Sequence, residues 1–295
     1  MKKLIALFIW LSFTSSVWGN PIHIVTSFSI LEDLVRQVVG EQADHIIIHN
    51  IVKINSDPHI YQPSPNDVAL LSKADLIIVN GLGLEGWIDR LIKASHYKGR
   101  HVIVSDKIRP RILTSKDGTL EADPHAWHSV NNVILYVEAI ITALCEIDSS
   151  HADYYKKRGK LFIDDLKKLD CWVQQQFKKI PKSKRVVVTT HDAFGYFGID
   201  YRIRFLSPLG LSTETEPAAF EVATLINQIR QEKIKGVFIE NLSNRKLIDQ
   251  IAEEAGVQIK GKLYADSLSE PTGPAPTYIK MIEYNTLTLS TVLKD

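Results

Sequence analysis

Four side chains that lie far apart in this sequence could together bind a metal ion. His59, His125 and His191 supply imidazole nitrogens, and Asp266 supplies a carboxylate. These donors suit first-row divalent metals such as zinc, manganese and iron. Three neutral imidazoles and one carboxylate leave one positive charge on a divalent ion uncompensated. A partly buried cleft tolerates that charge when neighbouring groups help to balance it.

The spacing of these four residues does not by itself indicate that they meet. They are separated by 66, 66 and 75 residues, which matches no local zinc-binding motif. On this ground alone, each histidine could simply cap a loop or form a local hydrogen bond. Ordinary structural roles are predicted for the other seven histidines, which lie in strands or in polar and helical surroundings: His23, His45, His49, His96, His101, His128 and His151.

The first part of the chain is predicted to form a parallel sheet. Short β-branched runs alternate with helical patterns from Ile22 to Asp106, which implies right-handed crossovers. The predicted strands are Ile22–Val25, His45–Val52, Asp75–Asn80 and His101–Ser105. The predicted helices are Ile30–Val39, Asn66–Lys73 and one around Trp87–Ala94. The strands are almost entirely apolar, as expected for a sheet covered on both faces.

A long helix is expected in the middle of the chain. Asn131–Cys145 forms one amphipathic helix, and His151–Lys179 continues as a helical pattern that ends at Pro181. Apolar residues recur along the second helix at spacings of three to five: Leu161, Leu166, Leu169, Val173 and Phe177. So long a helix makes a stiff connection between two lobes.

The last part of the chain repeats the layout of the first. The predicted strands are Arg185–Thr190, Ile203–Leu206, Gly236–Glu240 and Gln258–Tyr264. The predicted helices are Ala193–Phe197, Pro217–Gln231, Arg245–Ala255 and Pro276–Leu293. Ligands of open α/β sheets bind beyond the carboxyl ends of the strands. His59, His191 and Asp266 follow strands, and His125 lies in the loop region of the first lobe. Each lobe can thus offer two donors to one cleft.

The composition is that of an ordinary globular protein. The chain has 295 residues, of which 45% are hydrophobic and 23% charged, and these values exclude disorder, collagen-like repeats and a disulfide scaffold. We expect an α/β fold of two (β/α) lobes with parallel sheets, covering 20–148 and 181–295, joined by one long helix over 149–180. Lys and Arg number 35 and Asp and Glu 34, so nucleic-acid binding is not expected.

The N-terminus is predicted to be a secretory signal peptide over residues 1–19. Lys2 and Lys3 precede an apolar run from Leu4 to Phe13, and Gly19 ends a short polar-to-small segment where cleavage is expected. A buried N-terminal helix is the alternative. No cysteine stands near the cleavage point, so we expect no lipid anchor, and no later stretch is expected to cross a membrane. The mature protein should be exported, soluble and monomeric.

Two cysteines would meet an oxidising compartment, where a disulfide is permitted. Cys145 precedes the break at Ser149-Ser150, and Cys171 lies about twenty residues beyond it. At ~1.5 Å of rise per residue, Cys171 would lie roughly 30 Å along the second helix. The Cα atoms of a disulfide lie within ~7 Å. We therefore predict two free, buried thiols.

Several motifs taken together resemble one protein family. They are Asp57-Pro58-His59-Ile60-Tyr61-Gln62-Pro63-Ser64, Asn80-Gly81-Leu82-Gly83-Leu84-Glu85-Gly86-Trp87, Asp123-Pro124-His125-Ala126-Trp127, Thr190-His191-Asp192-Ala193-Phe194-Gly195-Tyr196-Phe197, Glu214-Thr215-Glu216-Pro217 and Leu263-Tyr264-Ala265-Asp266-Ser267-Leu268. The chain resembles the zinc- and manganese-binding periplasmic proteins of ABC importers, the ZnuA/TroA-like cluster A-I group. The resemblance runs from about Ile22 to the C-terminus, with the motifs in the family's order.

The resemblance implies a fold, a ligand and a partner. Family members have two (β/α) lobes joined by one long helix, and they hold a single metal ion between the lobes. The matching positions make His59 and His125 the ligands from the first lobe, and His191 and Asp266 those from the second. The implied ion is Mn²⁺ or Zn²⁺, one per chain, captured in the periplasm and delivered to the membrane permease of an ABC importer.

The sequence also departs from the family's pattern. His128 stands where many members have another residue, and we interpret it as part of a helix start and prefer His125 as the ligand. Lys107–Glu121 contains no histidine, whereas many zinc importers carry a histidine-rich loop there. Three imidazoles favour zinc, but the missing loop favours manganese. We predict manganese or a broad manganese and zinc specificity.

Three other functions are alternatives to metal transport. A zinc hydrolase needs an open coordination position and a general base, and Glu216 or Glu240 could be proposed as that base. Both glutamates fit structural positions better, because Glu216 precedes a proline at a helix start and Glu240 ends a strand. A surface adhesin is neither favoured nor excluded by the residues. A siderophore- or vitamin-binding protein would need a wide aromatic or arginine-lined cleft instead.

Overall fold

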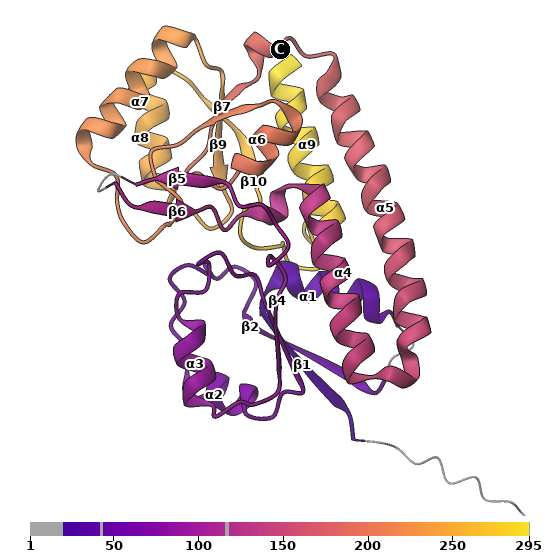
Figure 1. Ribbon diagram of the computed structural model, residues 1–295. Helices are drawn as coiled ribbons and strands as arrows, with labels where there is room; N and C mark the ends of the chain where they lie inside the picture. The colour runs from indigo at the N-terminus through magenta and orange to yellow at the C-terminus, as the bar shows by residue number, and fades with distance from the viewer. Residues whose placement is uncertain (1–19, 42–43, 116–117, 295) are drawn as a thin grey trace, which may run out of the picture.

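The computed structural model describes residues 20–41, 44–115 and 118–294. Two α/β lobes lie one above the other, and a pair of long helices runs along their side (Figure 1). Each lobe contains a four-stranded sheet in which every pairing is parallel. The predicted signal peptide and its alternative, a buried N-terminal helix, concern residues 1–19 and lie outside the described residues.

The first lobe carries the sheet of order β2-β1-β3-β4. Its strands are β1 (Ile22–Phe28), β2 (Ile46–Val52), β3 (Leu76–Val79) and β4 (Arg100–Ile103). Its helices are α1 (Ser29–Val39), α2 (Pro65–Leu71) and α3 (Ile88–Ala94). All four residues of β3 are buried, as expected for an apolar central strand covered on both faces.

The second lobe repeats this arrangement with the order β10-β9-β7-β8. Counted within the lobe, this is the same order as in the first sheet read from the opposite edge. Its strands are β7 (Val186–Val188), β8 (Arg204–Leu206), β9 (Gly236–Glu240) and β10 (Ile259–Leu263). Its helices are α6 (Gly195–Tyr201), α7 (Ala219–Glu232), α8 (Arg245–Ala255) and α9 (Tyr278–Lys294). The predicted α/β class with two parallel-sheet lobes is thus confirmed.

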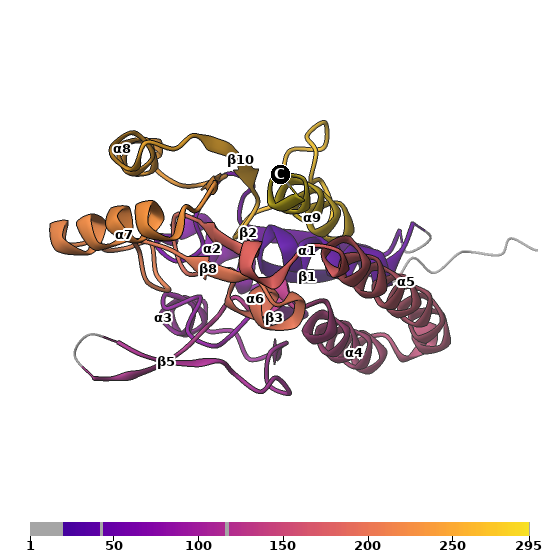
Figure 2. The same cartoon turned by 90° about the horizontal axis from the view of Figure 1, so that it is seen from above.

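Two antiparallel helices form the stiff side of the molecule. They are α4 (Val130–Ile147) and α5 (Ala152–Lys178), and they lie side by side in both views (Figure 1, Figure 2). The 27 residues of α5 extend roughly 40 Å at 1.5 Å per residue. Gly159 lets the helices approach closely, since a Cβ atom there would lie 2.1 Å from Ile141 Cδ1. The predicted long helix is confirmed.

One position in the predicted apolar stripe of α5 is wrong. Leu161 is 53% exposed, and Phe162 next to it is buried instead. From Phe162 the buried stripe continues through Leu166 and Leu169 at spacings of four and three, which keep side chains on one face of a 3.6-residue helix. A spacing of five, from Leu161 to Leu166, turns the side chain away from that face.

The hydrophobic core is continuous across the two lobes. Its larger cluster combines the first sheet with residues of α1, α4, α5, α6 and α9, while a smaller cluster lies beneath α7 and α8. The C-terminal helix begins against the first lobe, because the Tyr278 backbone N–H donates to Asp33 Oδ2 at 2.7 Å and the Tyr278 hydroxyl to the Trp127 carbonyl at 2.8 Å. The lobes are therefore joined by more than the linking helix.

Short segments complete the described fold. The hairpin of β5 (Ile112–Thr114) and β6 (Leu120–Ala122) was not predicted, because its strands are too short to show a pattern. Three 3₁₀ turns lie at Ala126–His128, Ser149–His151 and Lys182–Lys184. At the end of α8, Gly256 adopts φ 72°, the left-handed conformation typical of a helix C-cap.

The cysteine prediction is partly confirmed. Cys145 and Cys171 are both free, as the helix geometry requires. The expected burial is wrong, because Cys171 is exposed and Cys145 is only half-buried. On α5, Asp170 and Val173 on either side of Cys171 face the core. The Cys171 side chain points away from that face, towards solvent.

The helix α4 is long and apolar enough to cross a membrane by length and composition alone, contrary to the prediction that no later stretch would be. The apolar composition of this helix is explained by its packing inside the protein. Val133, Tyr136, Val137 and Ile140 on this helix have no exposed surface, and α4 contacts α1, α5, β3 and β4. It is a helix of the protein core.

We predict that the interior of α5 governs the stability of the whole molecule. Replacing fully buried Leu166 by alanine should lower the free energy of unfolding by about 2–5 kcal/mol, through lost burial and the cavity left behind. Leu161→Ala on the exposed face is the matched control and should change it by less than about 0.5 kcal/mol. Urea unfolding of the metal-free protein measures both values. Equal effects would contradict the assignment of the buried face.

Candidate metal centre

The structure brings the four predicted donors together between the lobes. His125 Nε2 lies 3.1 Å from His59 Nε2 and 3.2 Å from His191 Nε2. The oxygens of Asp266 lie 3.3, 3.6 and 3.8 Å from the Nε2 atoms of His191, His125 and His59, in that order. Tetrahedral ligands with bonds of ~2.0–2.1 Å lie roughly 3.3 Å apart. The donor atoms are thus spaced as around one ion.

Two carboxylates outside this cluster orient two of the imidazoles. Asp123 Oδ1 lies 2.8 Å from His125 Nδ1, and Glu240 Oε2 accepts a hydrogen bond from His191 Nδ1. A carboxylate can only accept, so each Nδ1 carries the hydrogen and the Nε2 of the neutral ring keeps a lone pair. This carboxylate–histidine arrangement is typical of protein metal sites.

The carboxylate of Asp266 is buried without full hydrogen bonding. The residue is 2% exposed, and Oδ1 has no hydrogen-bond partner among the described residues. An unsatisfied buried oxygen costs about 1–3 kcal/mol, and more when it is charged. A cation among the three imidazoles would supply the missing partner.

Related turns position His59 and His125, the two clustered histidines of the first lobe. In the segments Asp57-Pro58-His59 and Asp123-Pro124-His125, the aspartate accepts a hydrogen bond from the backbone N–H of the histidine two residues on, at 2.8 and 3.0 Å. Each turn is also held from outside. Trp87 Nε1 donates to the Pro58 carbonyl at 2.9 Å, and Asn80 Nδ2 to the Pro124 carbonyl at 2.9 Å.

The Asn80 loop itself depends on a glycine. Gly81 adopts φ 86°, and a Cβ atom there would lie 2.3 Å from Ile103 Cγ2. Buried Glu85 fastens the loop by accepting hydrogen bonds from the backbone N–H groups of Asn80 and Gly81. The Asn80–Trp87 motif therefore acts on the cluster through both turns, the one that carries His59 and the one that carries His125.

In the second lobe, the ends of β7, β9 and β10 supply the remaining groups. Glu240, the last residue of β9, accepts backbone hydrogen bonds from Thr190 and His191 through Oε1, at 2.8 and 3.0 Å. Asp266 follows β10, and the Ala265 carbonyl beside it accepts from Trp127 Nε1 at 3.0 Å. The Asp266 loop is thus tied to the first lobe although its strand belongs to the second.

The electrostatics of the cluster favour a cation. Burial lowers the pKa of His59 to about 3, so this ring is neutral at physiological pH. Burial also opposes protonation of His191, but the Glu240 and Asp266 carboxylates raise the pKa of His191 well above its usual value. For Asp266 burial is outweighed by His191, His125 and His59, which lower its pKa. A metal ion binding here would displace a proton from His191.

His125 lies in the cluster of four donors, whereas His128 lies outside it. His128 is fully buried in the 3₁₀ turn Ala126–His128 and stacks on Phe194 with ring centroids 4.4 Å apart. It is not among the four clustered residues, and within the described chain neither of its ring nitrogens has a hydrogen-bond partner. Its expected place at a helix start is close to correct, because α4 begins two residues later.

Sequence reasoning missed the roles of Asp123 and Glu240. Asp123 was seen only as part of a motif, and Glu240 only as a strand end or a possible base. One signal was available for Asp123, because the same dipeptide, Asp-Pro, directly precedes both predicted histidine ligands of the first lobe. Glu240 lies 49 residues from His191, so no local pattern could connect them.

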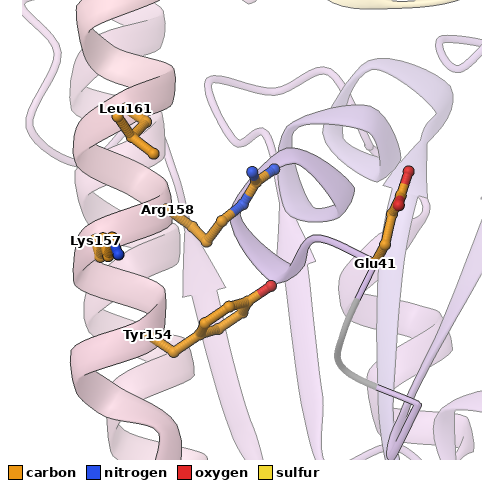
Figure 3. Close-up of a pocket in the computed structure, with 5 residues that line it drawn as sticks. All are labelled: Glu41, Tyr154, Lys157, Arg158 and Leu161. Atoms are coloured by element: carbon orange, nitrogen blue, oxygen red, sulfur yellow. The ribbon is translucent and has the colours of Figure 1, made fainter.

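Several cavities in the described part of the chain lie outside the cluster. One of about 630 Å³ opens beside it, with Asp57 and Ile60 from the first lobe facing Thr190 and Thr213 from the second. Another of about 490 Å³ lies between the end of α1 and α5, where Figure 3 shows Arg158 and Tyr154 pointing from the helix towards the segment that carries Glu41. None of the four clustered donors lines either cavity.

Two α/β lobes, each built on a parallel sheet, hold a buried cluster of donor side chains between them. This arrangement defines a two-lobed binding protein. A family model described as "Zinc-uptake complex component A periplasmic" matches residues 24–292. The chain therefore belongs to this family, the periplasmic component A of zinc-uptake complexes. This confirms the predicted family and its function as a metal-binding component of an ABC importer.

Individual relatives cover almost the whole chain. The manganese-binding lipoprotein MntA of Halalkalibacterium halodurans is 34% identical, over 90% of this chain and 87% of the relative. The iron-binding protein YfeA of Yersinia pestis is 33% identical, over 94% and 86%. The solved structure of the periplasmic zinc-binding protein TroA from Treponema pallidum has a TM-score of 0.86 at 29% identity, over 93% of this chain and 99% of that one.

The family places the protein outside the cytoplasm, as predicted. The absence of a lipid anchor stays a prediction, because the residues on which it depends precede residue 20. One of the relatives, MntA, is named a lipoprotein.

We predict that the carboxylate behind His191 strengthens metal binding. Glu240→Gln keeps the shape but removes the negative charge that holds the hydrogen on His191 Nδ1 and makes Nε2 a stronger donor, so the affinity for Zn²⁺ should fall by about 10–100-fold. Competition with a chromophoric chelator measures the affinity. Glu253→Gln, an exposed change on α8, is the control and should leave it unchanged. An unaltered affinity in Glu240→Gln would contradict the orienting role.

Proposed function

We propose that this protein captures one divalent transition-metal ion, manganese or zinc, with His59, His125, His191 and Asp266 and delivers it to a membrane permease. The observation that carries the proposal is the convergence of three imidazole Nε2 atoms on a buried carboxylate, with donor separations of 3.1–3.8 Å. Without a metal ion, a proton on His191 supplies the positive charge next to Asp266 in this buried space. A metal ion would replace that proton and be bound by all four donors.

The relatives support a metal of this class without fixing which one. Their names specify manganese, iron and zinc. Three imidazoles favour zinc, and zinc binds a given site more tightly than manganese in nearly every case. Both oxygens of Asp266 face imidazole nitrogens, and such an arrangement permits bidentate coordination, which suits the higher coordination number of manganese. We therefore propose manganese, or manganese together with zinc, as the physiological ion.

We infer that the protein is a transport component and not a metallohydrolase. Glu240 was a possible general base, but both of its oxygens are engaged by the backbone and ring of His191 and by Thr190. Glu216 is exposed and lines the neighbouring cavity. The four protein donors leave little room for an activated water. No observation on the described residues favours a surface adhesin.

The cavity beside the cluster supplies a route for the ion. Its wall includes Asp57 and Thr213, which meet across the lobes where Thr213 Oγ1 donates to Asp57 Oδ2 at 2.6 Å. We propose that the ion passes here and that the permease, the expected partner, binds the face where the two lobes meet. The mature chain is proposed to act as a monomer.

The release movement is proposed to be small. The segment after Asp266 is fastened to the first lobe, because Ser29 Oγ accepts from the Leu268 backbone N–H at 3.0 Å and Ser267 Oγ from the Asn55 backbone N–H at 3.2 Å. The core also continues across both lobes through α5 and α9. A local shift centred on Asp266 or His191 would open the site without a wide hinge motion.

We predict the result of a metal titration of residues 20–295 after a chelator has removed any bound metal. Zn²⁺ and Mn²⁺ should each bind with one tight equivalent, and His59→Ala should abolish that event because it removes one of the four donors. Calorimetry measures stoichiometry and affinity. His101→Ala, on an exposed strand position, is the control and should retain the tight equivalent. Absence of any tight binding in the unaltered protein would refute the proposal.

We predict that the two lobes move very little relative to one another when the metal binds or leaves. Small-angle scattering curves of the metal-free and metal-loaded protein should nearly superimpose, because the lobes share one core. A closure of tens of degrees, as in hinge-type binding proteins, would alter the curves plainly and contradict this prediction. A chelator-treated sample of His59→Ala with added metal provides the control for non-specific effects of the ion.

A further inference from the structure

A second group of metal-type side chains lies at the opposite end of the first lobe. His45 precedes β2, Asp148 ends α4, and His151 closes the 3₁₀ turn that leads into α5. The donor centre lies beyond the other end of β2, whose seven residues span roughly 23 Å at 3.3 Å per residue. The two groups share no residue, and the family's motifs include none of these three.

The donor atoms of these three side chains point towards one another. His45 Nε2 lies 2.8 Å from Asp148 Oδ2, and His151 Nδ1 lies 2.9 Å from both oxygens of Asp148. The two imidazoles stack with ring centroids 4.4 Å apart and planes inclined by 28°. One nitrogen of each ring is therefore aimed at the same carboxylate, and the three donor atoms lie within 4.8 Å of one another.

The carboxylate is held in place by groups that are not part of the triad. The Tyr155 hydroxyl donates to Asp148 Oδ2 at 2.5 Å, and the Ser150 hydroxyl donates to Asp148 Oδ1 at 2.7 Å. The Asp148 side chain is only 6% exposed, whereas those of His45 and His151 are 31% and 49% exposed. The acid is thus fixed and the imidazoles are open to water, as an ion with water ligands requires.

We propose that His45, Asp148 and His151 form a second binding site for a divalent first-row metal ion of the zinc and copper type. Two imidazoles and one carboxylate match the donor preference of these ions, and water would complete the coordination. The ion would take the place of the imidazole hydrogens now directed at Asp148, and each neutral ring would then carry its hydrogen on its other nitrogen, His45 on Nδ1 and His151 on Nε2. Opening the nitrogen–oxygen distances from 2.8 and 2.9 Å to roughly 3.3 Å needs only small side-chain rotations.

The site would join two separate parts of the first lobe. His45 lies at the start of a sheet strand, and Asp148 and His151 form the turn between the two long helices. An ion here would brace the helix pair against the sheet. Because only three protein donors are present and two are exposed, we expect weaker binding than at the four-donor centre.

The test separates this site from the proposed transport site. Four forms of the protein are freed of metal with a chelator and titrated with ZnCl₂ in a calorimeter. They are the unaltered protein, His59→Ala, His151→Ala and the double variant. We expect two, one, one and no equivalents, with the weaker event absent whenever His151 is replaced. His45→Gln, on a different element, should also weaken that event by more than the roughly 10–100-fold that outer-shell partners cost. Circular dichroism verifies folding, and His101→Ala is the surface-histidine control.

A spectroscopic readout distinguishes ligation from a structural role of the triad. One equivalent of Cu²⁺ added to His59→Ala should give an electron paramagnetic resonance signal with coupling to imidazole nitrogen, and this coupling should be lost in the double variant. A folded His59→Ala protein that binds no zinc would overturn the second site. If instead unaltered protein and His59→Ala each bind one equivalent that His151→Ala loses, the second site stands and the proposed transport site fails.

Discussion

The buried convergence of three imidazole nitrogens on the Asp266 carboxylate is the constraint on which the rest of the structure depends. In the metal-free protein a proton on His191 balances the carboxylates beside it, and a metal ion would replace that proton. Asp123 and Glu240 fix the tautomers of His125 and His191 and so commit their Nε2 atoms to the cluster. Charge balance in this buried space therefore depends on a cation, which is a proton on His191 or, as we propose, a metal ion.

That arrangement persists because the surrounding fold is rigid on both sides. The turn that carries His125 is fastened to the first lobe through Asn80, and the loop that carries Asp266 is fastened through Trp127. The core then continues from α1 through α5 to α9. Two lobes of similar layout are thereby joined into one body, which suits a carrier that presents its ion to a membrane partner through local changes.

Metal choice follows from the same geometry. Imidazole donors bind zinc more tightly than manganese. A protein that carries manganese must therefore raise its affinity for that ion in another way, for example by offering a higher coordination number. Both oxygens of Asp266 face the imidazoles, with Oδ1 3.6 Å from His125 Nε2 and Oδ2 3.3 Å from His191 Nε2. The family accordingly includes relatives named for manganese, iron and zinc.

Much of this protein was determined by sequence alone. Alternating apolar strands and amphipathic helices specified two parallel lobes and a long helix, since these patterns are local and periodic. Motif resemblance selected the four donors. Only the tertiary structure brought Glu240 behind His191 and His45 beside His151, because partners separated by 49 and 106 residues leave no periodic trace. It also decided that Leu161 faces outwards, which depends on which side of α5 meets the core.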